Sequence, residues 1–366
     1  MRTDELDYPF DPTLVATTPA EPRDAARLML VDRATGSIHH HAVRDLTALL
    51  RAGDHLVVNA TSVLRARLAL VDRARGRETE GLLLEPSAEA PLWRVLVRQA
   101  KRFEPGDRLA LRDGHGRDHG DAIELVRRDS EAWLARLVAG PRGGSVAEIL
   151  ERSGQTPLPP YILKARRDRS VSVDDDLDRA EYETVYARAS ARGSVAAPTA
   201  GLHFTPELLA TLAARGIGRS ELILDVGAGT FKPIDSDTLE AHDMHAERFT
   251  VPREVLATLA ASAAPRSSRA QRLVAVGTTT VRALESLPEP LPPPDRDHEA
   301  VTRILIQPGH RFRQVDALLT NFHLPRSTLL ALVGAFAGME LMREAYATAV
   351  RERYRFYSYG DAMLIV

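Results

Sequence analysis

The chain has 366 residues, 44% of them hydrophobic and 27% charged, which is the composition of an ordinary globular protein with length enough for two domains. The absence of cysteine excludes disulfides, thiolate nucleophiles and thiolate metal sites, and a net charge of −2 gives no overall case for nucleic-acid binding. Because no apolar run could span a bilayer and the first residues lack the apolar core of a signal peptide, we expect a cytoplasmic protein.

Residues 1–65 predict mixed α/β structure. Apolar segments on either side of the turn Ala34–Ser37 predict a β-hairpin, and a short helix over 43–50 precedes a buried strand at Leu56–Val58. The second hairpin strand contains three consecutive histidines, His39–His41. Because neighbours on a strand point to opposite faces, a solvated strand end is favoured over a metal site.

Between residues 66 and 144 the pattern changes to short apolar runs separated by turn residues. No helical periodicity occurs here, so the pattern predicts a small antiparallel barrel or sandwich. We predict that this segment is an inserted domain and that residues 1–65 and 145–366 form the main α/β domain. The apolar runs are 82–84, 93–97, 108–111, 123–126 and 133–137.

Residues 145–187 predict two short helices on either side of a charged stretch. The helices are expected over 145–150 and 181–187, and the prolines of 157–162 predict a stiff extended segment. Lys164–Arg169 is the densest basic patch of the chain. A solvated face is the favoured interpretation, with phosphate contact as the alternative.

The loop 193–205 consists mostly of small residues and interrupts every periodic pattern. Thr205 and Pro206 predict the N-cap and first position of a helix over 206–215. Ser194, Thr199 and His203 would then sit beside a helix N-terminus, where polar or anionic ligands are favoured. A tight structural crossover with a satisfied histidine is the alternative that the spacing leaves open.

A second glycine loop, Gly227–Phe231, follows a predicted strand at 221–226. Pro233 comes too soon after it for the phosphate-binding helix of a dinucleotide fold, so we reject that interpretation. The stretch His242–Glu247 then packs two imidazoles and two carboxylates into six residues. Zinc binding and general acid–base or hydrogen-bonding roles both remain open.

A strand over 272–276 is predicted to enter a Gly-Thr turn and a helix ending near Ser286, which suits a carboxylate, ribose or phosphate. Arg282 and Glu285 share one helical face and either pair with each other or bind substrate. A strand over 302–306, an apolar helix over 327–337 and a further helix through Tyr346 complete the chain.

Together these stretches resemble one family, the S-adenosylmethionine:tRNA ribosyltransferase-isomerases of the queuosine pathway. The resemblance implies an α/β main domain, with a mixed sheet and flanking helices, interrupted by a six-stranded antiparallel β-barrel. It also implies transfer and isomerisation of the ribosyl part of S-adenosylmethionine onto 7-aminomethyl-7-deazaguanine in tRNA, giving epoxyqueuosine, adenine and methionine. The matching stretches are 53–68, 157–162, 182–187, 193–205, 227–231, 242–247, 275–286, 321–330 and 354–365.

The sulfonium of S-adenosylmethionine already acidifies the adjacent 5′-carbon, so we expect no metal and no cofactor beyond this co-substrate. The expected partners are S-adenosylmethionine and tRNA, with no membrane, and we expect a monomer. We predict acid–base roles for His203, His242, His245, His323 and Asp361, and tRNA contacts for Lys101, Arg166, Arg167 and Arg169. The predicted substrate-binding residues are Ser194, Thr199, Gly201, Gly227, Gly229, Thr230, Thr278, Thr279, Arg282, Glu285 and Asn321.

Three positions depart from the family pattern. Ser62 and Arg65 stand where a basic residue and a proline are usual, and Asp225 stands where histidine is usual. The transfer chemistry is still expected, but the acceptor stays open between tRNA and a small-molecule deazapurine or another non-tRNA acceptor. A catalytically silent RNA-binding protein is disfavoured, because binding alone does not need the polar loops.

Overall fold

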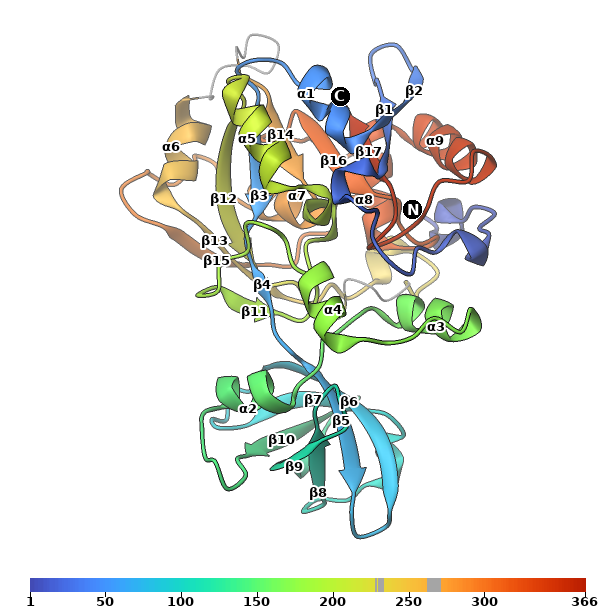
Figure 1. The fold of residues 1–366 in the computed structure, drawn as a ribbon. Helices are drawn as coiled ribbons and strands as arrows, with labels where there is room; N and C mark the ends of the chain where they lie inside the picture. The colour runs from blue at the N-terminus through green and yellow to red at the C-terminus, as the bar shows by residue number, and fades with distance from the viewer. Residues whose placement is uncertain (228, 230–233, 262–270) are drawn as a thin grey trace.

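The computed structural model describes residues 1–227, 229, 234–261 and 271–366, and it contains a nine-stranded mixed sheet and a closed six-stranded barrel (Figure 1). The predicted fold class, an α/β domain interrupted by a small antiparallel barrel, is therefore confirmed. None of the helices in this part of the chain combines the length and apolarity needed to cross a bilayer.

The large sheet has the strand order β15-β13-β12-β3-β14-β16-β17-β1-β2. Its four middle strands, β12, β3, β14 and β16, run parallel, so their carboxyl ends meet at one edge. Strand β13 runs antiparallel to both of its neighbours, and β17 runs antiparallel to β16 but parallel to β1; both β13 and β17 begin at this same edge. The bounds are β1 Arg27–Val31, β2 Ile38–Ala42, β3 His55–Asn59, β12 Gly218–Leu224, β13 Glu247–Val251, β14 Leu273–Val276, β15 His298–Thr302, β16 Ala317–Asn321 and β17 Ala362–Ile365.

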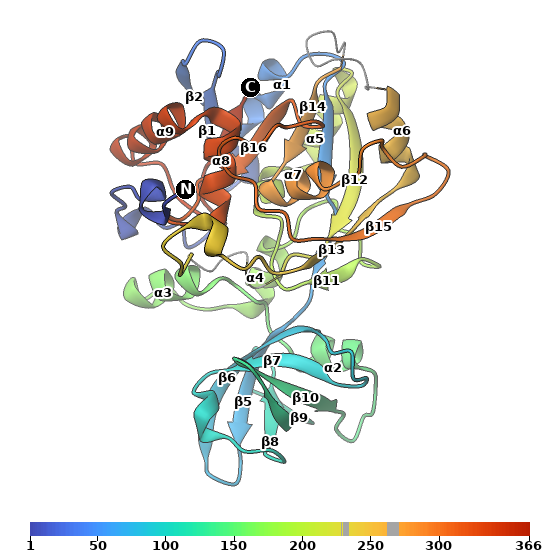
Figure 2. The same cartoon turned by 180° about the vertical axis from the view of Figure 1, so that it is seen from behind.

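Helices cover both faces of the sheet, which is why β14 and β16 are buried along their whole length and are apolar up to the polar pair that ends β16. Helices α1 and α5 pack on one face, and α6, α7, α8 and α9 pack on the other (Figures 1 and 2). The bounds are α1 Leu46–Leu49, α5 Pro206–Ala214, α6 Arg253–Ala261, α7 Thr278–Glu285, α8 Thr328–Ala337 and α9 Met339–Arg351.

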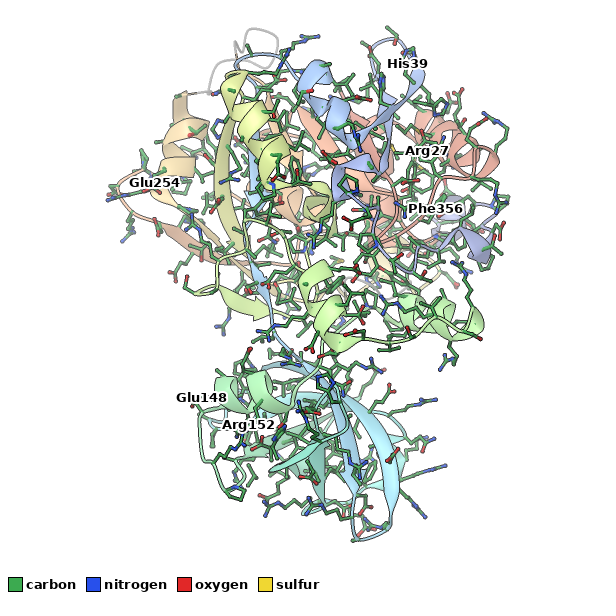
Figure 3. The ribbon with its side chains drawn as sticks, in the orientation of Figure 1. Arg27, His39, Glu148, Arg152, Glu254 and Phe356 are labelled. Atoms are coloured by element: carbon green, nitrogen blue, oxygen red, sulfur yellow. The ribbon has the colours of Figure 1, made fainter. Side chains whose placement is uncertain are left out.

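The barrel closes in the order β10-β7-β6-β5-β8-β9, and each predicted apolar run lies within one of its strands. Helix α2, Val146–Ser153, packs Ile149 and Leu150 onto the barrel core, and Arg152 ion-pairs with Asp121 of β9 at 2.7 Å (Figure 3). The strands are β5 Arg67–Asp72, β6 Arg77–Pro86, β7 Trp93–Val97, β8 Arg108–Arg112, β9 Asp118–Asp129 and β10 Ala132–Val138.

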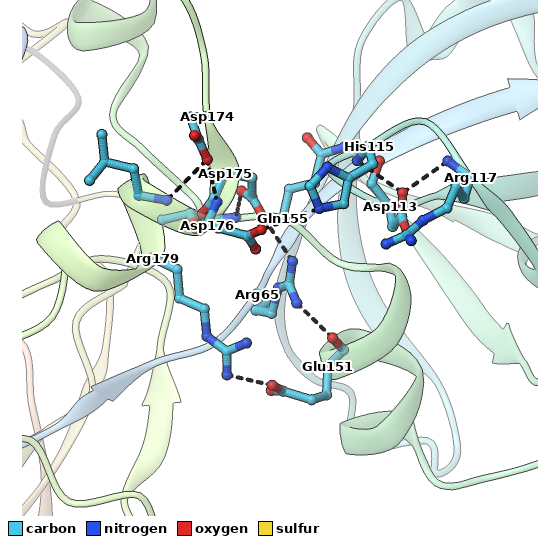
Figure 4. A network of polar contacts seen from close by, with 12 residues as sticks. Arg65, Asp113, His115, Arg117, Glu151, Gln155, Asp174, Asp175, Asp176 and Arg179 are labelled. Atoms are coloured by element: carbon cyan, nitrogen blue, oxygen red, sulfur yellow. Dashed lines mark hydrogen bonds and ion pairs between the residues drawn. The ribbon is translucent and has the colours of Figure 1, made fainter.

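Arg65 joins the barrel to the main domain. One guanidinium nitrogen donates to the backbone oxygen of Glu151 after the barrel, and another pairs with Asp175 at 2.7 Å (Figure 4). His115 of the barrel also lies 3.3 Å from Asp176. The short parallel pair formed by β4, Ser62–Val63, and β11, Arg192–Ser194, lies where the chain leaves for the barrel and later re-enters the central loop.

Three element boundaries differ from the sequence expectations. The segment 157–162 is extended only up to α3, Pro160–Asp168, because proline is favoured at a first helical position. The helix expected over 181–187 is wrong: the helix here is α4, Asp175–Glu181, which starts where Asp174 accepts from two backbone N–H groups, and residues 182–187 are turns and loop. The strand expected over 302–306 is wrong, because the strand here is β15, which ends at Thr302. Short 3₁₀ helices are η1 Thr3–Leu6, η2 Pro12–Leu14, η3 Arg23–Ala25, η4 Val43–Asp45, η5 Ala100–Arg102, η6 Thr199–His203 and η8 Leu239–Ala241.

Candidate active site

A pocket opens at the carboxyl edge of the parallel strands, beside η6 and the start of α7. It encloses about 630 Å³ of empty space, open solvent at its mouth included. Ligands of open α/β sheets bind at this edge, because the loops that follow the parallel strands converge there. The lining residues are Tyr161, Ala197, Pro198, Thr199, Ala200, Val226, Gly277, Thr278, Thr279, Thr320, Asn321, Phe322, His323, Leu324, Ser327, Leu329, Tyr357 and Ser358.

The central loop supplies one wall of this pocket, and its predicted polar residues have different places. Thr199 lines the pocket, whereas Ser194 is fully buried and bonds Thr61 Oγ1 and the Val226 backbone N–H, each at 2.8 Å. Gly201 is a packing glycine, because a Cβ there would lie 2.0 Å from Tyr186 Oη. The loop therefore combines one pocket hydroxyl with residues that hold its shape.

Helix α7 begins at the pocket, as the strand-turn-helix pattern predicted. Gly277 has a φ of +90°, a conformation that favours glycine, and the hydroxyl-bearing residues Thr278 and Thr279 follow it into the pocket wall. The first N–H groups of a helix lack partners within the helix and carry its positive end. This corner can therefore bind a carboxylate or a ribose hydroxyl.

Arg282 and Glu285 do not pair with each other, and neither lines the pocket. Glu285 accepts hydrogen bonds from three consecutive backbone N–H groups, residues 313–315, at 2.8–3.1 Å, and so fastens the loop before β16. Arg282 forms a buried ion pair with Glu247, whose other oxygen accepts from the Gly227 backbone N–H at 3.2 Å. Among the described residues, Arg282 Nη2 is buried without a partner.

Two predicted acid–base histidines lie at this edge, and His323 lines the pocket whereas His203 does not. His323 Nε2 is 2.8 Å from Thr320 Oγ1, and His203 Nε2 is 3.2 Å from Asn321 Nδ2. Burial lowers the pKa of His323 to about 3. Burial, aided by two nearby arginines, also lowers the pKa of His203 to about 3. Both imidazoles are therefore neutral at pH 7.

The other predicted acid–base residues lie away from the pocket lining. His242 is half-buried and His245 is exposed, with its ring against Gly229. Asp361 is buried and accepts from the backbone N–H groups of Arg27 and Arg355, so it organises the start of β1 and β17. Thr230 lies outside the described residues. Within the described ranges, His, Asp and Glu side chains form no group of three that could hold a metal ion.

The four predicted tRNA contacts differ in their exposure. Lys101 and Arg167 are exposed. Arg166 is buried and ion-paired with Asp178 at 2.6 Å, so the prediction that it contacts RNA does not fit its position. Arg169 donates to three backbone carbonyls of the N-terminal segment, which already engage its guanidinium.

Several residues that line the pocket were not predicted as site residues, and three of them lie side by side in chain or space. Tyr161 and Ser358 hydrogen-bond to each other through their hydroxyls at 2.5 Å, and Tyr357 beside them has a φ of +72°. Such strained backbone at a non-glycine residue concentrates at functional sites. The segment 354–365 matched the family pattern, but a positive φ at tyrosine leaves no sign in sequence.

The fold and pocket define an α/β protein with a pocket at the ends of its parallel strands and a separate closed barrel. The family model described as "Queuosine biosynthesis protein" matches residues 3–365. Relatives named S-adenosylmethionine:tRNA ribosyltransferase-isomerase occur in Rubrobacter xylanophilus, 46% identical over 100% of this chain and 98% of the relative, and in a Methylobacterium strain, 48% identical with the same coverage.

Among solved structures, the crystal structure of an S-adenosylmethionine tRNA ribosyltransferase from Thermotoga maritima matches with a TM-score of 0.53. The two sequences are 33% identical, and the match covers 99% of this chain and 100% of that one. The chain therefore belongs to the queuosine biosynthesis protein family, and the family prediction is confirmed.

Proposed function

We propose that this protein transfers and isomerises the ribosyl part of S-adenosylmethionine onto 7-aminomethyl-7-deazaguanine in tRNA. The products are epoxyqueuosine in the tRNA, adenine and methionine. We propose that the enzyme is a monomer and acts in the cytoplasm. The full-length similarity to relatives of that name supports the reaction class. The observation that carries the proposal is the pocket, which combines apolar walls, hydroxyls and a neutral imidazole.

His323 is the acid–base group that we assign to this pocket. The reaction needs a base for the 5′-carbon next to the sulfonium, and a neutral imidazole can accept that proton. A pKa of about 3 reflects the cost of a buried cation. Proton transfer from a sulfonium substrate leaves the total charge of the site unchanged, because one cation disappears as the other forms. That cost is therefore partly offset in the reaction.

The hydroxyls of Thr199, Thr278 and Thr279 are our candidates for the ribose and for the methionine carboxylate. They lie on two separate elements, η6 and α7, that face the same cavity. The helix N-terminus adds a favourable field for the carboxylate. Such fixed donors position the substrate before reaction, which lowers the entropic part of the barrier.

We propose that tRNA contacts include Lys101 and Arg167, whose side chains are exposed. A local contact of this kind is compatible with a net charge of −2, because phosphate binding depends on where the cations lie. The alternative acceptor, a free deazapurine nucleoside or another small molecule, remains a second candidate because of Ser62, Arg65 and Asp225.

The test supplies labelled S-adenosylmethionine with and without tRNA that carries 7-aminomethyl-7-deazaguanine. We expect adenine and methionine in equal amounts, with the modified tRNA only and without added metal. Release driven equally well by the free nucleoside would replace the tRNA proposal by the small-molecule one. Inhibition by a chelator that added metal reverses would contradict the proposal that S-adenosylmethionine suffices.

A further inference from the structure

The side chain of Asn321 has a fixed orientation at the end of β16. Its Nδ2 donates to the backbone oxygen of Tyr357 at 3.0 Å and contacts His203 Nε2 at 3.2 Å. Because a backbone carbonyl can only accept, the amide nitrogen must lie on this side. His203 Nε2 is then the acceptor of the second contact, and the proton of its neutral ring is on Nδ1.

The other end of this amide is unsatisfied. Asn321 is 2% exposed and lines the pocket, and among the described residues its Oδ1 has no hydrogen-bond partner. Buried carbonyl oxygens are nearly always paired, so an unpaired one at a pocket is a place where a ligand or a water can supply the donor. The other walls near it are apolar or aromatic, including Phe322, Leu329 and Val226, which suits a flat ring.

We propose that Asn321 is a specificity-determining residue whose Oδ1 accepts a hydrogen bond from the exocyclic amino group of the adenine of S-adenosylmethionine. His203 is a positioning residue, which holds the amide in this orientation and does not touch the substrate. This inference rests on the proposed function, because it takes S-adenosylmethionine as the ligand of this pocket. It assigns to His203 a role different from the general base that its sequence position suggested.

The first experiment compares binding of S-adenosylmethionine with binding of its 6-oxo analogue, S-inosylmethionine, by calorimetry without tRNA. The analogue has a carbonyl in place of the amino group, so the wild-type protein should prefer S-adenosylmethionine about tenfold or more. In Asn321→Leu this preference should disappear. The matched control is His55→Leu, because His55 is a half-buried histidine at the amino end of β3, bonded to Ser220 Oγ at 2.7 Å. This control should keep the preference even if its melting temperature falls.

The second experiment compares His203→Gln with His203→Leu. Glutamine can place its side-chain oxygen where Nε2 accepts from Asn321, whereas leucine cannot. We expect turnover per folded molecule of the glutamine variant within about threefold of wild type, and at least a tenfold loss in the leucine variant together with a loss of amino-group preference. Equal losses of turnover in both variants, with the preference retained, would make His203 a catalytic base and overturn the positioning role.

These outcomes are separable from failure of the proposed function. If wild-type protein neither binds nor consumes S-adenosylmethionine, both proposals fall. If it does both, and Asn321→Leu keeps the full preference for the amino group over the carbonyl, the inference about Asn321 is overturned while the proposed function stands.

Discussion

The buried ion pair between Arg282 and Glu247 offers a sharp test of how the site is supported. The side chains are 5% and 3% exposed, and Glu247 also accepts from the Gly227 backbone N–H. Removing one partner of a buried pair leaves an uncompensated charge and typically costs about 3–5 kcal/mol. We expect Glu247→Leu and Arg282→Met each to destabilise the main domain by this amount. The double variant should cost several kcal/mol less than the sum, because neither charge remains.

The assay can separate the two domains, because both tryptophans of the chain, Trp93 and Trp133, lie in the barrel. Urea unfolding followed by helical circular dichroism reports mainly on the α/β domain, and tryptophan fluorescence reports on the barrel. The dichroism transition should shift in the single variants while the fluorescence transition stays near its wild-type midpoint. Single costs below about 1 kcal/mol, or costs that simply add, would refute the view that the two charges depend on each other.

Three further expectations concern the histidines and arginines. His323→Gln should lower turnover by about two to four orders of magnitude with S-adenosylmethionine binding nearly intact, and unchanged hydrogen exchange at the 5′-carbon would exclude it as the base. Since the folded-state pKa values of His323 and His203 are about 3, against 6.5 for the free group, the unfolded chain binds more protons below pH 6.5. Their contribution to stability is therefore complete above pH 6.5 and is lost as the pH falls towards 3. Urea titrations over that range should show the loss reduced in His203→Gln. Arg167→Ala should lower the salt slope of tRNA binding by about 1. Arg166→Ala should instead unfold more easily, because it leaves the buried carboxylate of Asp178 without its ion-pair partner. A lower salt slope in Arg166→Ala with unchanged stability would instead support a contact between Arg166 and RNA.

The sequence predicted the places of the polar loops better than the direction of their side chains. Small residues and Thr205-Pro206 identified the central loop, and Thr205 does cap α5 by accepting from the Leu208 N–H at 3.1 Å. That Thr199 lines the pocket while Ser194 is buried depends on the segments just after β3 and β12, which contribute the partners of Ser194. Local pattern contains no information about those distant strands.

Helical spacing likewise placed Arg282 and Glu285 on related faces without showing their partners. Arg282 pairs with a residue of β13, and Glu285 binds backbone groups that precede β16. Arg166 shows the same limit, because a basic run on a sequence does not distinguish an exposed arginine from one that is neutralised inside. The charge of a segment can be predicted from the sequence, but which of its charged side chains are exposed to solvent depends on the tertiary structure.

The strand order of the large sheet has a consequence for how the chain is made. β1 lies between β2 and β17, so residues 27–31 cannot complete their pairing until residues 362–365 have been synthesised. The barrel strands, in contrast, are contiguous from residue 67 to residue 138. At roughly 5–20 residues per second, a ribosome needs on the order of tens of seconds between the last barrel strand and β17. The insert can therefore be complete while its host sheet is still half-synthesised. During that interval the open edge of the early hairpin can pair with wrong partners, and loss of the last few residues would leave that edge and one edge of β16 permanently without a partner strand.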